Sequence, residues 1–401
     1  MALIVQKFGG SSVANAERIF NVAQIVTETW RAGNEVVVVL SAQGDTTDDL
    51  IAKAAEINPN ASKREMDVLL NTGEQISCAL AAMAIDKLGC PVISLTGWQV
   101  GMQTDSSYGS ARIKRVSGTR IREELDKRKI VIVCGFQGIN KYGDVTTLGR
   151  GGSDTTAVAL AVSLKADLCQ IYTDVDGVYT ADPRLCPNAR KLDEITYDEM
   201  LELASLGAQV LHNRSVEMGK RYNMNIEVLS SFSRKPGTIV KEVAKMEKTC
   251  VAGVAKDVNV ARIALIGIRH VPGEAYKIFS LLAKRKINVD IILQSIGRSD
   301  SKDISFTVDL ASVDAAREVL EQNRDTLNFD RLDISTDVAK VSIVGAGMAN
   351  NPGVAATMFE ALYEAGINIR MISTSEIKVS VLIDEADANR AVQAIHAKFF
   401  E

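Results

Sequence analysis

The sequence predicts an α/β protein: a layered domain with a central, mostly parallel sheet, followed by two βαββαβ units. Three observations predict this fold. Residues 1–232 alternate short β-branched runs with longer amphipathic segments, residues 233–250 are charged and lack a sustained period, and the remainder contains an internal repeat. We therefore expect a first domain at 1–232, a linker at 233–250, and repeat units at 251–337 and 338–401.

Five strands are predicted in the first domain, and each ends in a cluster of Gly, Ser, Thr or Asp. They span residues 3–8, 35–41, 91–96, 130–136 and 168–173. Residues 16–32 carry apolar side chains along one helical face, and residues 154–166 have the composition of a buried helix. Because ligands of open α/β sheets bind beyond the carboxyl ends of the strands, we expect the functional site at these polar clusters.

The first cluster, KFGGSS at residues 7–12, lies directly after a strand and before a helix. Glycines let backbone N–H groups approach phosphate oxygens closely, the helix N-terminus adds partial positive charge, and Lys7 adds a full one. Tight packing of the glycines and a solvated lysine are the alternative explanation. The cluster lacks the P-loop pattern G-x-x-x-x-G-K-[ST], which disfavours the nucleotide-binding folds that carry it.

The second cluster, TTLGRGGSD at residues 146–154, surrounds Arg150 with three glycines. Because glycines remove bulk, the guanidinium can bind a carboxylate or phosphate in bidentate fashion. Ser153 and Asp154 open the next predicted helix and could equally cap it, and the two roles are compatible. The cluster therefore indicates a binding site at the start of a helix.

A third cluster, TDVDGVYTADPR at residues 173–184, begins where a strand ends. Its aromatic ring, arginine and carboxylates suit a nucleotide with Mg²⁺, although Asp-Gly and Asp-Pro are also ordinary turn formers. Two smaller clusters are residues 41–48, after the second strand, and Thr72-Gly73-Glu74, where a helix is expected to begin. Loop formation and helix capping are the alternatives for both.

The C-terminal repeat aligns VPGEAYKIF with NPGVAATMF at an offset of 80 residues, the separation of Pro272 from Pro352. Each copy predicts a strand, a Pro-Gly turn, a helix, an Ile-Asn turn, two strands and a closing helix. The first N–H groups of the helix can bind a carboxylate, and Asn288 and Asn368 place an amide nearby. Turn formation alone is the alternative, but the duplication favours a binding role.

The composition excludes several classes of protein. Lys and Arg number 46 against 50 Asp and Glu, so no basic field is present to bind nucleic acid or an anionic membrane. The first apolar run is too short for a signal peptide, and no run approaches the roughly 18 residues of a membrane span, so we expect a cytoplasmic protein. Six scattered cysteines and three distant histidines predict neither disulfides nor a zinc site.

Five segments in order, KFGGSSV, SAQGDTTDDL, NTGEQIS, TTLGRGGSDTTA and TDVDGVYTADPR, resemble the motifs of the aspartate kinases of the amino-acid kinase family. The C-terminal repeat is similar to their paired, ferredoxin-like ACT domains. The resemblance implies ATP-dependent, Mg²⁺-dependent phosphorylation of the β-carboxylate of L-aspartate, the first step of lysine, threonine and methionine biosynthesis. It also implies lysine or threonine as inhibitors and a homo-oligomer assembled through ACT domains.

The same resemblance implies roles for individual residues. Catalytic roles fall to Lys7 and Asp154. The residues that would border ATP are Lys7, Phe8, Gly9, Gly10, Ser41, Thr173, Asp174, Tyr179, Asp182 and Arg184. Those that would position aspartate are Thr47, Glu74, Arg150, Gly151, Gly152 and Ser153. Those that would bind the effector are Gly273, Glu274, Asn288, Asp290, Gln294, Gly353, Asn368, Ile369, Ser375 and Glu376.

Some positions depart from the commoner family pattern. Gln43 replaces a frequent methionine, and Gln209 and Asn213 replace a frequent lysine and proline. A non-catalytic amino-acid sensor is the main alternative function, and retention of Lys7 and Asp154 argues against it. A fusion to homoserine dehydrogenase is not expected, because no dinucleotide-binding G-x-G-x-x-G unit follows the repeat.

Overall fold

The computed structural model describes residues 1–206, 210–233, 235–243, 250–295 and 301–401, which form two units. The first unit contains Met1–Tyr179, Lys191–Ser205 and Gln209–Glu247. The second contains Thr180–Arg190, Leu206–Ala208 and Lys248–Glu401. The short segment Thr180–Arg190 thus leaves the first unit and returns to it, which the sequence pattern did not predict.

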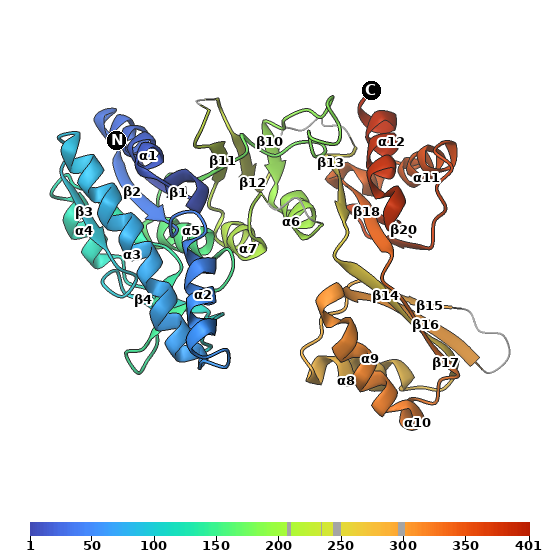
Figure 1. The fold of residues 1–401 in the computed structure, drawn as a ribbon. Helices are drawn as coiled ribbons and strands as arrows, with labels where there is room; N and C mark the ends of the chain where they lie inside the picture. Colours follow the sequence, from blue (N-terminus) through green and yellow to red (C-terminus); the bar gives the residue numbers. More distant parts are fainter. Residues whose placement is uncertain (207–209, 234, 244–249, 296–300) are drawn as a thin grey trace. The chain divides into compact units, whose positions relative to one another are not determined.

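An eight-stranded sheet is the centre of the first unit (Figure 1). Its order is β10-β12-β11-β9-β1-β2-β6-β3, and the strands from β11 to β3 are mutually parallel. The bounds are β1 Leu3–Phe8, β2 Glu35–Leu40, β3 Val92–Leu95, β6 Ile130–Cys134, β9 Leu168–Thr173, β10 Glu194–Thr196, β11 Ile226–Ser230 and β12 Thr238–Lys241. The five predicted strands are confirmed, and their carboxyl ends lie along one edge of the sheet.

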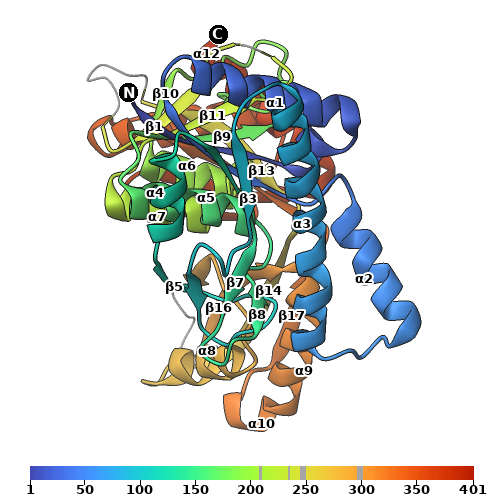
Figure 2. The same cartoon turned by 90° about the vertical axis from the view of Figure 1, so that its left-hand side faces the viewer.

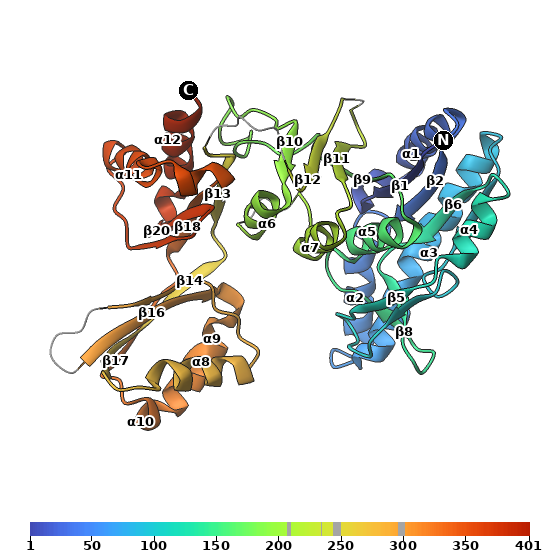
Figure 3. The same ribbon diagram turned by 180° about the vertical axis from the view of Figure 1, so that it is seen from behind.

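Helices cover both faces of this sheet. One core joins the helices α1 (Ala16–Arg31) and α3 (Lys63–Lys87) to β1, β2 and β6. Figure 2 shows α3 with the neighbouring α2 (Thr46–Ile57). On the other face, α5 (Gly152–Leu164) contacts β1 and β2 and lies beside α7 (Asn213–Tyr222), as Figure 3 shows. Although α3 has the length and hydropathy of a membrane span, it packs as a core helix against the sheet.

Smaller elements complete the first unit. A four-stranded sheet has the order β5-β4-β7-β8. Its strands and the remaining helices are β4 Met102–Thr104, β5 Ile113–Val116, β7 Gln137–Ile139, β8 Val145–Thr147, α4 Thr119–Leu125 and α6 Tyr197–Ser205. The cluster around Arg150 begins in β8 and continues in the connection from β8 to α5, so the small sheet positions part of the predicted site.

Two sequence-based expectations about the first unit are wrong. β12 pairs with β10 and β11, so the predicted linker at 233–250 begins too early: part of it completes the large sheet. Thr72-Gly73-Glu74 lie in the interior of α3 and do not start a helix. The helix begins at Lys63, where the Ser62 side chain accepts a hydrogen bond from the backbone N–H of Glu65, a capping signal that lies earlier in the chain.

The second unit contains two βαββ modules. The first module spans residues 260–335, and its sheet has the order β15-β16-β14-β17. Its elements are β14 Val260–Arg269, α8 Glu274–Lys284, β15 Ile292–Gln294, β16 Ser301–Asp309, α9 Val313–Gln322, α10 Arg324–Leu327 and β17 Arg331–Ser335. Figure 1 shows α8 and α9 together on one face of this sheet, which confirms the predicted βαββαβ unit.

The second module consists of residues 338–400 together with β13 (Gly253–Asp257). Its other elements are β18 Val338–Val344, α11 Val354–Glu364, β19 Met371–Thr374, β20 Lys378–Asp384 and α12 Ala388–Phe400. The sheet order β13-β18-β20-β19 gives β13 the place that β17 occupies in the first module. The expected boundaries at 251 and 338 therefore need correction, because the second module takes its edge strand from the chain that precedes the first.

Candidate functional site

The centre of the site is a buried ion pair between Lys7 and Asp154. The Lys7 Nζ lies 2.7 Å from the Asp154 Oδ1, and each residue is only 9% exposed. Lys7 is near the carboxyl end of β1, and Asp154 lies in the first turn of α5, whose N-terminus has no side-chain cap. The carboxylate is thus used to hold the ammonium group, not to cap the helix. Because buried charges are costly, a pair at a sheet edge indicates function.

Glycines bring the backbone of neighbouring loops close to this pair. A Cβ atom on Gly9 would lie 3.5 Å from the Lys7 Nζ, and one on Gly10 would lie only 2.8 Å from the carbonyl oxygen of Ala42. The backbone N–H of Gly44 donates to the carbonyl of Gly10 over 3.0 Å. The loops after β1 and β2 therefore touch beside the ammonium group, and at Gly10 the contact leaves no room for a side chain.

Glu74 presents a second buried charge at the same edge. Its Oε1 accepts a hydrogen bond of 3.2 Å from the backbone N–H of Ala42, directly beyond β2. Its Oε2 is buried and has no hydrogen-bond partner among the residues that the structure describes. Burial raises the pKa of the Glu74 carboxyl to about 7. An unpaired carboxylate oxygen in this position would be satisfied by a ligand ammonium group.

The Gly-Arg loop lies between β8 and α5. Gly149 and Gly151 adopt φ values of 79° and 68°, a region that favours glycine, and Arg150 between them is exposed. The Arg150 guanidinium forms no hydrogen bond or ion pair within the described part of the chain. It is therefore available to a ligand carboxylate.

Gly135 and Phe136 are site residues that the sequence analysis missed. A Cβ on Gly135 would lie 2.5 Å from the Ser153 Oγ and 2.9 Å from the carbonyl oxygen of Leu40. Phe136 has a φ of 67°. Together they let the end of β6 approach the start of α5. The dipeptide Gly-Phe after a buried strand was the available signal, and it was counted as the end of the strand.

The remaining predicted nucleotide residues divide between the two units. The Thr173 Oγ1 lies 2.9 Å from the Asp174 Oδ1 at the end of β9, beside β1. The Tyr179 hydroxyl donates to Asp176 over 2.7 Å. Asp182 and Arg184 belong instead to the second unit, where they pair with each other at 2.7 Å. The structure does not group them with Lys7, and their contact with ATP stays a prediction.

Three other predicted site residues, Phe8, Ser41 and Thr47, lie near the carboxyl ends of β1 and β2. Phe8 stacks on Tyr172 with ring centroids 4.4 Å apart, which makes it a core residue below the site. Ser41 follows β2 and is partly buried, and its carbonyl accepts from the Ser77 hydroxyl. Thr47 lies in the first turn of α2 and is also partly buried.

Some of the predicted effector residues of the first module line a pocket of about 320 Å³. Gly273, with a φ of 98°, precedes the first residue of α8, and Glu274 and Gln294 also line the pocket. Asp290 lies just before β15 and pairs with Lys340 of the second module at 2.6 Å, while Asn288 is exposed. Three of the five predicted residues of this module thus share one cavity.

In the second module the predicted effector residues are more dispersed. Gly353 precedes α11 with a φ of 99°, which matches Gly273. The others flank the edge strand β19: Asn368 and Ile369 precede it, and Ser375 and Glu376 follow it. None of them lines the pocket formed by the first module.

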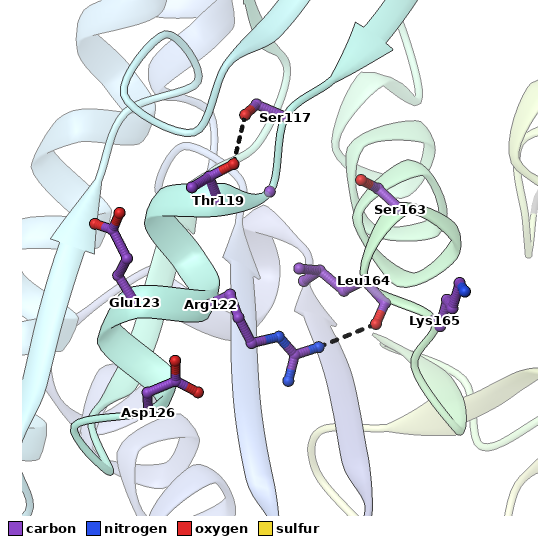
Figure 4. A pocket seen from close by; sticks show the side chains of 9 residues that line it. Ser117, Thr119, Arg122, Glu123, Asp126, Ser163, Leu164 and Lys165 are labelled. Carbon is purple, nitrogen blue, oxygen red and sulfur yellow. Dashed lines mark hydrogen bonds between the residues drawn. The ribbon is translucent and has the colours of Figure 1, made fainter.

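A further pocket, of about 370 Å³, lies between α4 and the C-terminal end of α5 (Figure 4). There Arg122 donates to the carbonyl of Leu164 over 3.1 Å and pairs with Glu35. α5 rises about 1.5 Å per residue, so this end lies roughly 15 Å from Asp154. None of the predicted site residues lines the pocket, and it is separate from the candidate active site.

Comparisons with known proteins agree with this arrangement. Residues 2–230 match the model of the amino acid kinase family, and residues 263–323 and 341–399 match an ACT domain. The aspartokinase of Bacillus sp. (strain MGA3) is 51% identical over 100% of this chain and 97% of its own length. The aspartokinase of Mycolicibacterium smegmatis is 52% identical over 100% of this chain and 96% of its own length.

Two solved structures of E. coli aspartokinase III are also similar to the chain. The complex with aspartate and ADP (R-state) has a TM-score of 0.84 at 27% sequence identity, covering 100% of both chains. The complex with lysine and aspartate (T-state) has a TM-score of 0.77 at 28% identity, also covering 100% of both chains. The similarity extends over the kinase-like unit and the repeat together.

Proposed function

Since this chain belongs to the aspartokinases of the amino acid kinase family, we propose that it transfers the γ-phosphoryl group of ATP to the β-carboxylate of L-aspartate. The product would be 4-phospho-L-aspartate, the first intermediate on the route to lysine, threonine and methionine, made in the cytoplasm. The observation that carries the proposal is the buried Lys7–Asp154 pair, which lies beside two glycines and at the same sheet edge as the unpaired carboxylate oxygen of Glu74.

Aspartate binding is assigned to the charged residues around that edge. Glu74 would bind the substrate ammonium group, which satisfies its buried Oε2. Arg150, exposed between two glycines, would bind a substrate carboxylate in bidentate fashion. Ser153 and Thr47 would supply hydroxyl groups. The E. coli aspartokinase III complex with aspartate and ADP supports this choice of substrates.

Phosphoryl transfer then needs positioning and charge neutralisation. The β-carboxylate is already a competent nucleophile, so its oxygen forms the new bond to phosphorus while the bond to the bridging oxygen of ADP breaks. Lys7 and the backbone of Gly9 and Gly10 would stabilise the transferring group, and Asp154 would orient Lys7. Mg²⁺, when bound with ATP, would neutralise part of the charge on the phosphates.

Regulation is assigned to lysine or threonine bound by the second unit. The repeat places Glu274 and Asp290 in the first module where the second has Val354 and Arg370. Glu274 and Asp290 pair with Lys277 and Lys340 in this structure, so a cationic effector side chain would take the place of a lysine beside these carboxylates in the first module. The E. coli complex with lysine and aspartate supports lysine as an effector. Inhibition requires tighter binding to an inactive arrangement, with a coupling of about 1–3 kcal/mol.

Assembly into a homo-oligomer is part of the same proposal. β15 and β19 are edge strands, and each exposes an isoleucine: Ile292 is 50% exposed and Ile372 is 41% exposed. Unpaired edges with apolar side chains favour pairing with another copy of the chain. Sedimentation of the purified protein measures the number of subunits, and a monomer at micromolar concentration would contradict this part.

An assay of ATP turnover with single amino acids tests the activity. Aspartate should support turnover in the presence of Mg²⁺, whereas glutamate and N-acetylglutamate should support little. Addition of lysine, threonine or both should lower the rate with aspartate. Equal turnover with N-acetylglutamate would refute the substrate assignment.

A further inference from the structure

Asp67 is a buried carboxylate for which the mechanism above has no role. It lies on α3, is 1% exposed, and forms no ion pair with any residue that the structure describes. Its oxygens instead accept hydrogen bonds from two loops. The backbone N–H of Gly109 lies 3.0 Å from each oxygen, and Thr147 donates through its N–H at 2.9 Å and its hydroxyl at 2.7 Å. Burial raises the pKa of Asp67 while these hydrogen bonds oppose the shift.

Arg214 on α7 binds the same two segments through their carbonyl groups. Its Nη1 donates to the carbonyl of Leu148 over 2.6 Å, and its Nη2 donates to that of Ala111 over 3.0 Å. The segments are also bonded directly, because the N–H of Ala111 donates to the carbonyl of Thr147 over 2.9 Å. The segments at residues 109–111 and 147–148 therefore form one hydrogen-bonded pair. The Asp67 carboxylate accepts hydrogen bonds from its N–H groups, and the Arg214 guanidinium donates to its carbonyl groups.

This paired structure leads directly into the Gly-Arg loop. Thr147 ends β8, and Leu148 and Gly149 connect it to Arg150. A Cβ on Gly149 would lie 3.0 Å from the carbonyl oxygen of Gly109, the residue whose N–H is bound by Asp67. The backbone immediately before Arg150 is thus fixed on two sides.

Asp67 also shares a helix with Glu74. The two residues are seven positions apart on α3, which is close to two turns, so both side chains lie on one helical face. α3 therefore carries the group assigned to the substrate ammonium and, two turns earlier, the carboxylate that fixes the loop before the arginine assigned to the substrate carboxylate. The separation of the two protein groups assigned to the ends of the substrate, Glu74 and Arg150, therefore depends on this helix.

We propose that Asp67 and Arg214 are positioning residues that hold Arg150 at a fixed distance from Glu74 and so set the affinity for the amino-acid substrate. The inference rests on the proposed function for the identity of the substrate. Neither residue touches the reacting atoms. Their effect should fall on aspartate binding and not on ATP, because nucleotide binding is assigned to the ends of β1 and β9.

Asp67→Asn is the first test, because the amide keeps the size of the side chain but turns an NH₂ donor toward donors. We expect the KM for aspartate to rise at least tenfold while the KM for ATP changes less than twofold. Arg214→Lys, which cannot bridge two carbonyl groups, should give the same split. Asp86→Asn and Arg221→Lys, at exposed positions on the same two helices, are matched controls and should behave as wild type.

Hydrogen–deuterium exchange gives a second readout that needs no substrate. Asp67→Asn should speed exchange in peptides that cover residues 105–111 and 145–151, with little change in β1 or β9. Thr147→Val, which removes only the hydroxyl donor to Asp67, should have a smaller effect in the same peptides and replaces Asp67→Asn if that variant does not fold.

The outcomes separate this inference from the proposed function. Wild-type protein that turns over no aspartate refutes the proposed function. The exchange pattern still decides whether Asp67 fixes the backbone before Arg150. Active wild type together with an unchanged aspartate KM in Asp67→Asn and Arg214→Lys refutes the positioning role. A fall in thermal stability with equal changes in both KM values would assign these residues to the fold alone.

Discussion

At the residue scale, the site depends on a few buried charges whose partners are incomplete without substrate. Lys7 and Asp154 neutralise each other, whereas Glu74 has one oxygen without a partner among the described residues. Leaving a buried polar atom unpaired costs about 1–3 kcal/mol. The unpaired oxygen of Glu74 therefore destabilises the protein without ligand. A bound ammonium group would supply the missing partner and remove this penalty, as expected of a binding residue.

Removal of either member of the Lys7–Asp154 pair should lower kcat strongly. Loss of one preorganised charge at a transferring group typically costs about a hundredfold or more. Lys7→Ala and Asp154→Ala should both show this loss in steady-state assays at saturating aspartate and ATP. Arg150→Ala should instead raise the KM for aspartate, and an unchanged KM would mean that Arg150 has another role.

Titration of Glu74 should control the pH dependence of aspartate use. Its pKa of about 7 means that the ionised form, which binds an ammonium group, gains population as the pH rises through neutrality. The kcat/KM for aspartate should therefore rise between pH 6 and pH 8, and Glu74→Gln should abolish that inflection as well as lower the value. An inflection that persists in Glu74→Gln would belong to another group.

The same shift has a consequence for stability. Burial raises the pKa of Glu74 from 4.5 in the unfolded chain to about 7, so the folded protein binds the proton more tightly. The stability gained in this way is present below about pH 4.5 and is lost as the pH rises through 7. Glu74→Gln, which carries no charge, should thus raise the melting temperature relative to wild type at pH 8 but not at pH 5.

At the element scale, α3 and the loop after β2 are packed so closely that a glycine is required in the helix. A Cβ on Gly73 would lie 2.9 Å from the Cβ of Ala42, whose N–H is bound by the neighbouring Glu74. Glycine inside a helix costs about 1 kcal/mol relative to alanine. The glycine nevertheless allows the helix that carries Glu74 to pack directly against the loop at the end of β2.

Gly73→Ala should therefore separate helix propensity from function. The extra methyl group would push α3 away from Ala42 and lengthen the hydrogen bond to Glu74, so the KM for aspartate should rise severalfold although the substitution favours helix. Thr72→Ala, on the exposed face one residue earlier, raises helix propensity, loses only a hydroxyl hydrogen bond to the carbonyl of Leu69 in the same helix, and is the control. An unchanged KM in Gly73→Ala would show that the loop absorbs the methyl group without loss of geometry.

At the scale of the whole molecule, the second unit is assembled from pieces that are distant in the chain. β13 precedes the first module but completes the sheet of the second. Ala181 and Cys186, from the segment that leaves the first unit, lie in the same core as Val341 and Met358. A polypeptide cut at the expected boundary between the modules would therefore divide one sheet.

Truncation after about Val243 should abolish the response to lysine or threonine, measured as a shift of the melting temperature, because it removes both modules. It also removes the core around Ala181 and Cys186, so loss of kinase activity in the truncated protein is expected to accompany it. Glu274→Gln with Asp290→Asn in the full chain is the sharper variant. It should raise the lysine concentration for half-inhibition at least tenfold with kcat unchanged, and retained sensitivity would place the effector elsewhere.

The sequence by itself determined the elements and the local clusters of this protein. The spacing of apolar residues predicts the strands from Leu3–Phe8 to Leu168–Thr173. The glycines beside Lys7 and Arg150 mark loops in which the backbone itself approaches other groups. The repeat gives both modules of the second unit. These features are local, because side-chain alternation and turn chemistry act within a few residues.

Only the tertiary structure decided which distant groups meet. The pairing of Asp67 with Thr147 joins residues 80 positions apart, and β13 reaches β18 across the whole first module. Asp182 is part of the nucleotide cluster in sequence but belongs to another unit of the structure than Thr173 and Asp174. Such contacts form because they bury apolar surface and satisfy buried hydrogen-bonding groups. Both effects depend on all the residues that surround a group in space, and the residues next to it in the chain do not determine them.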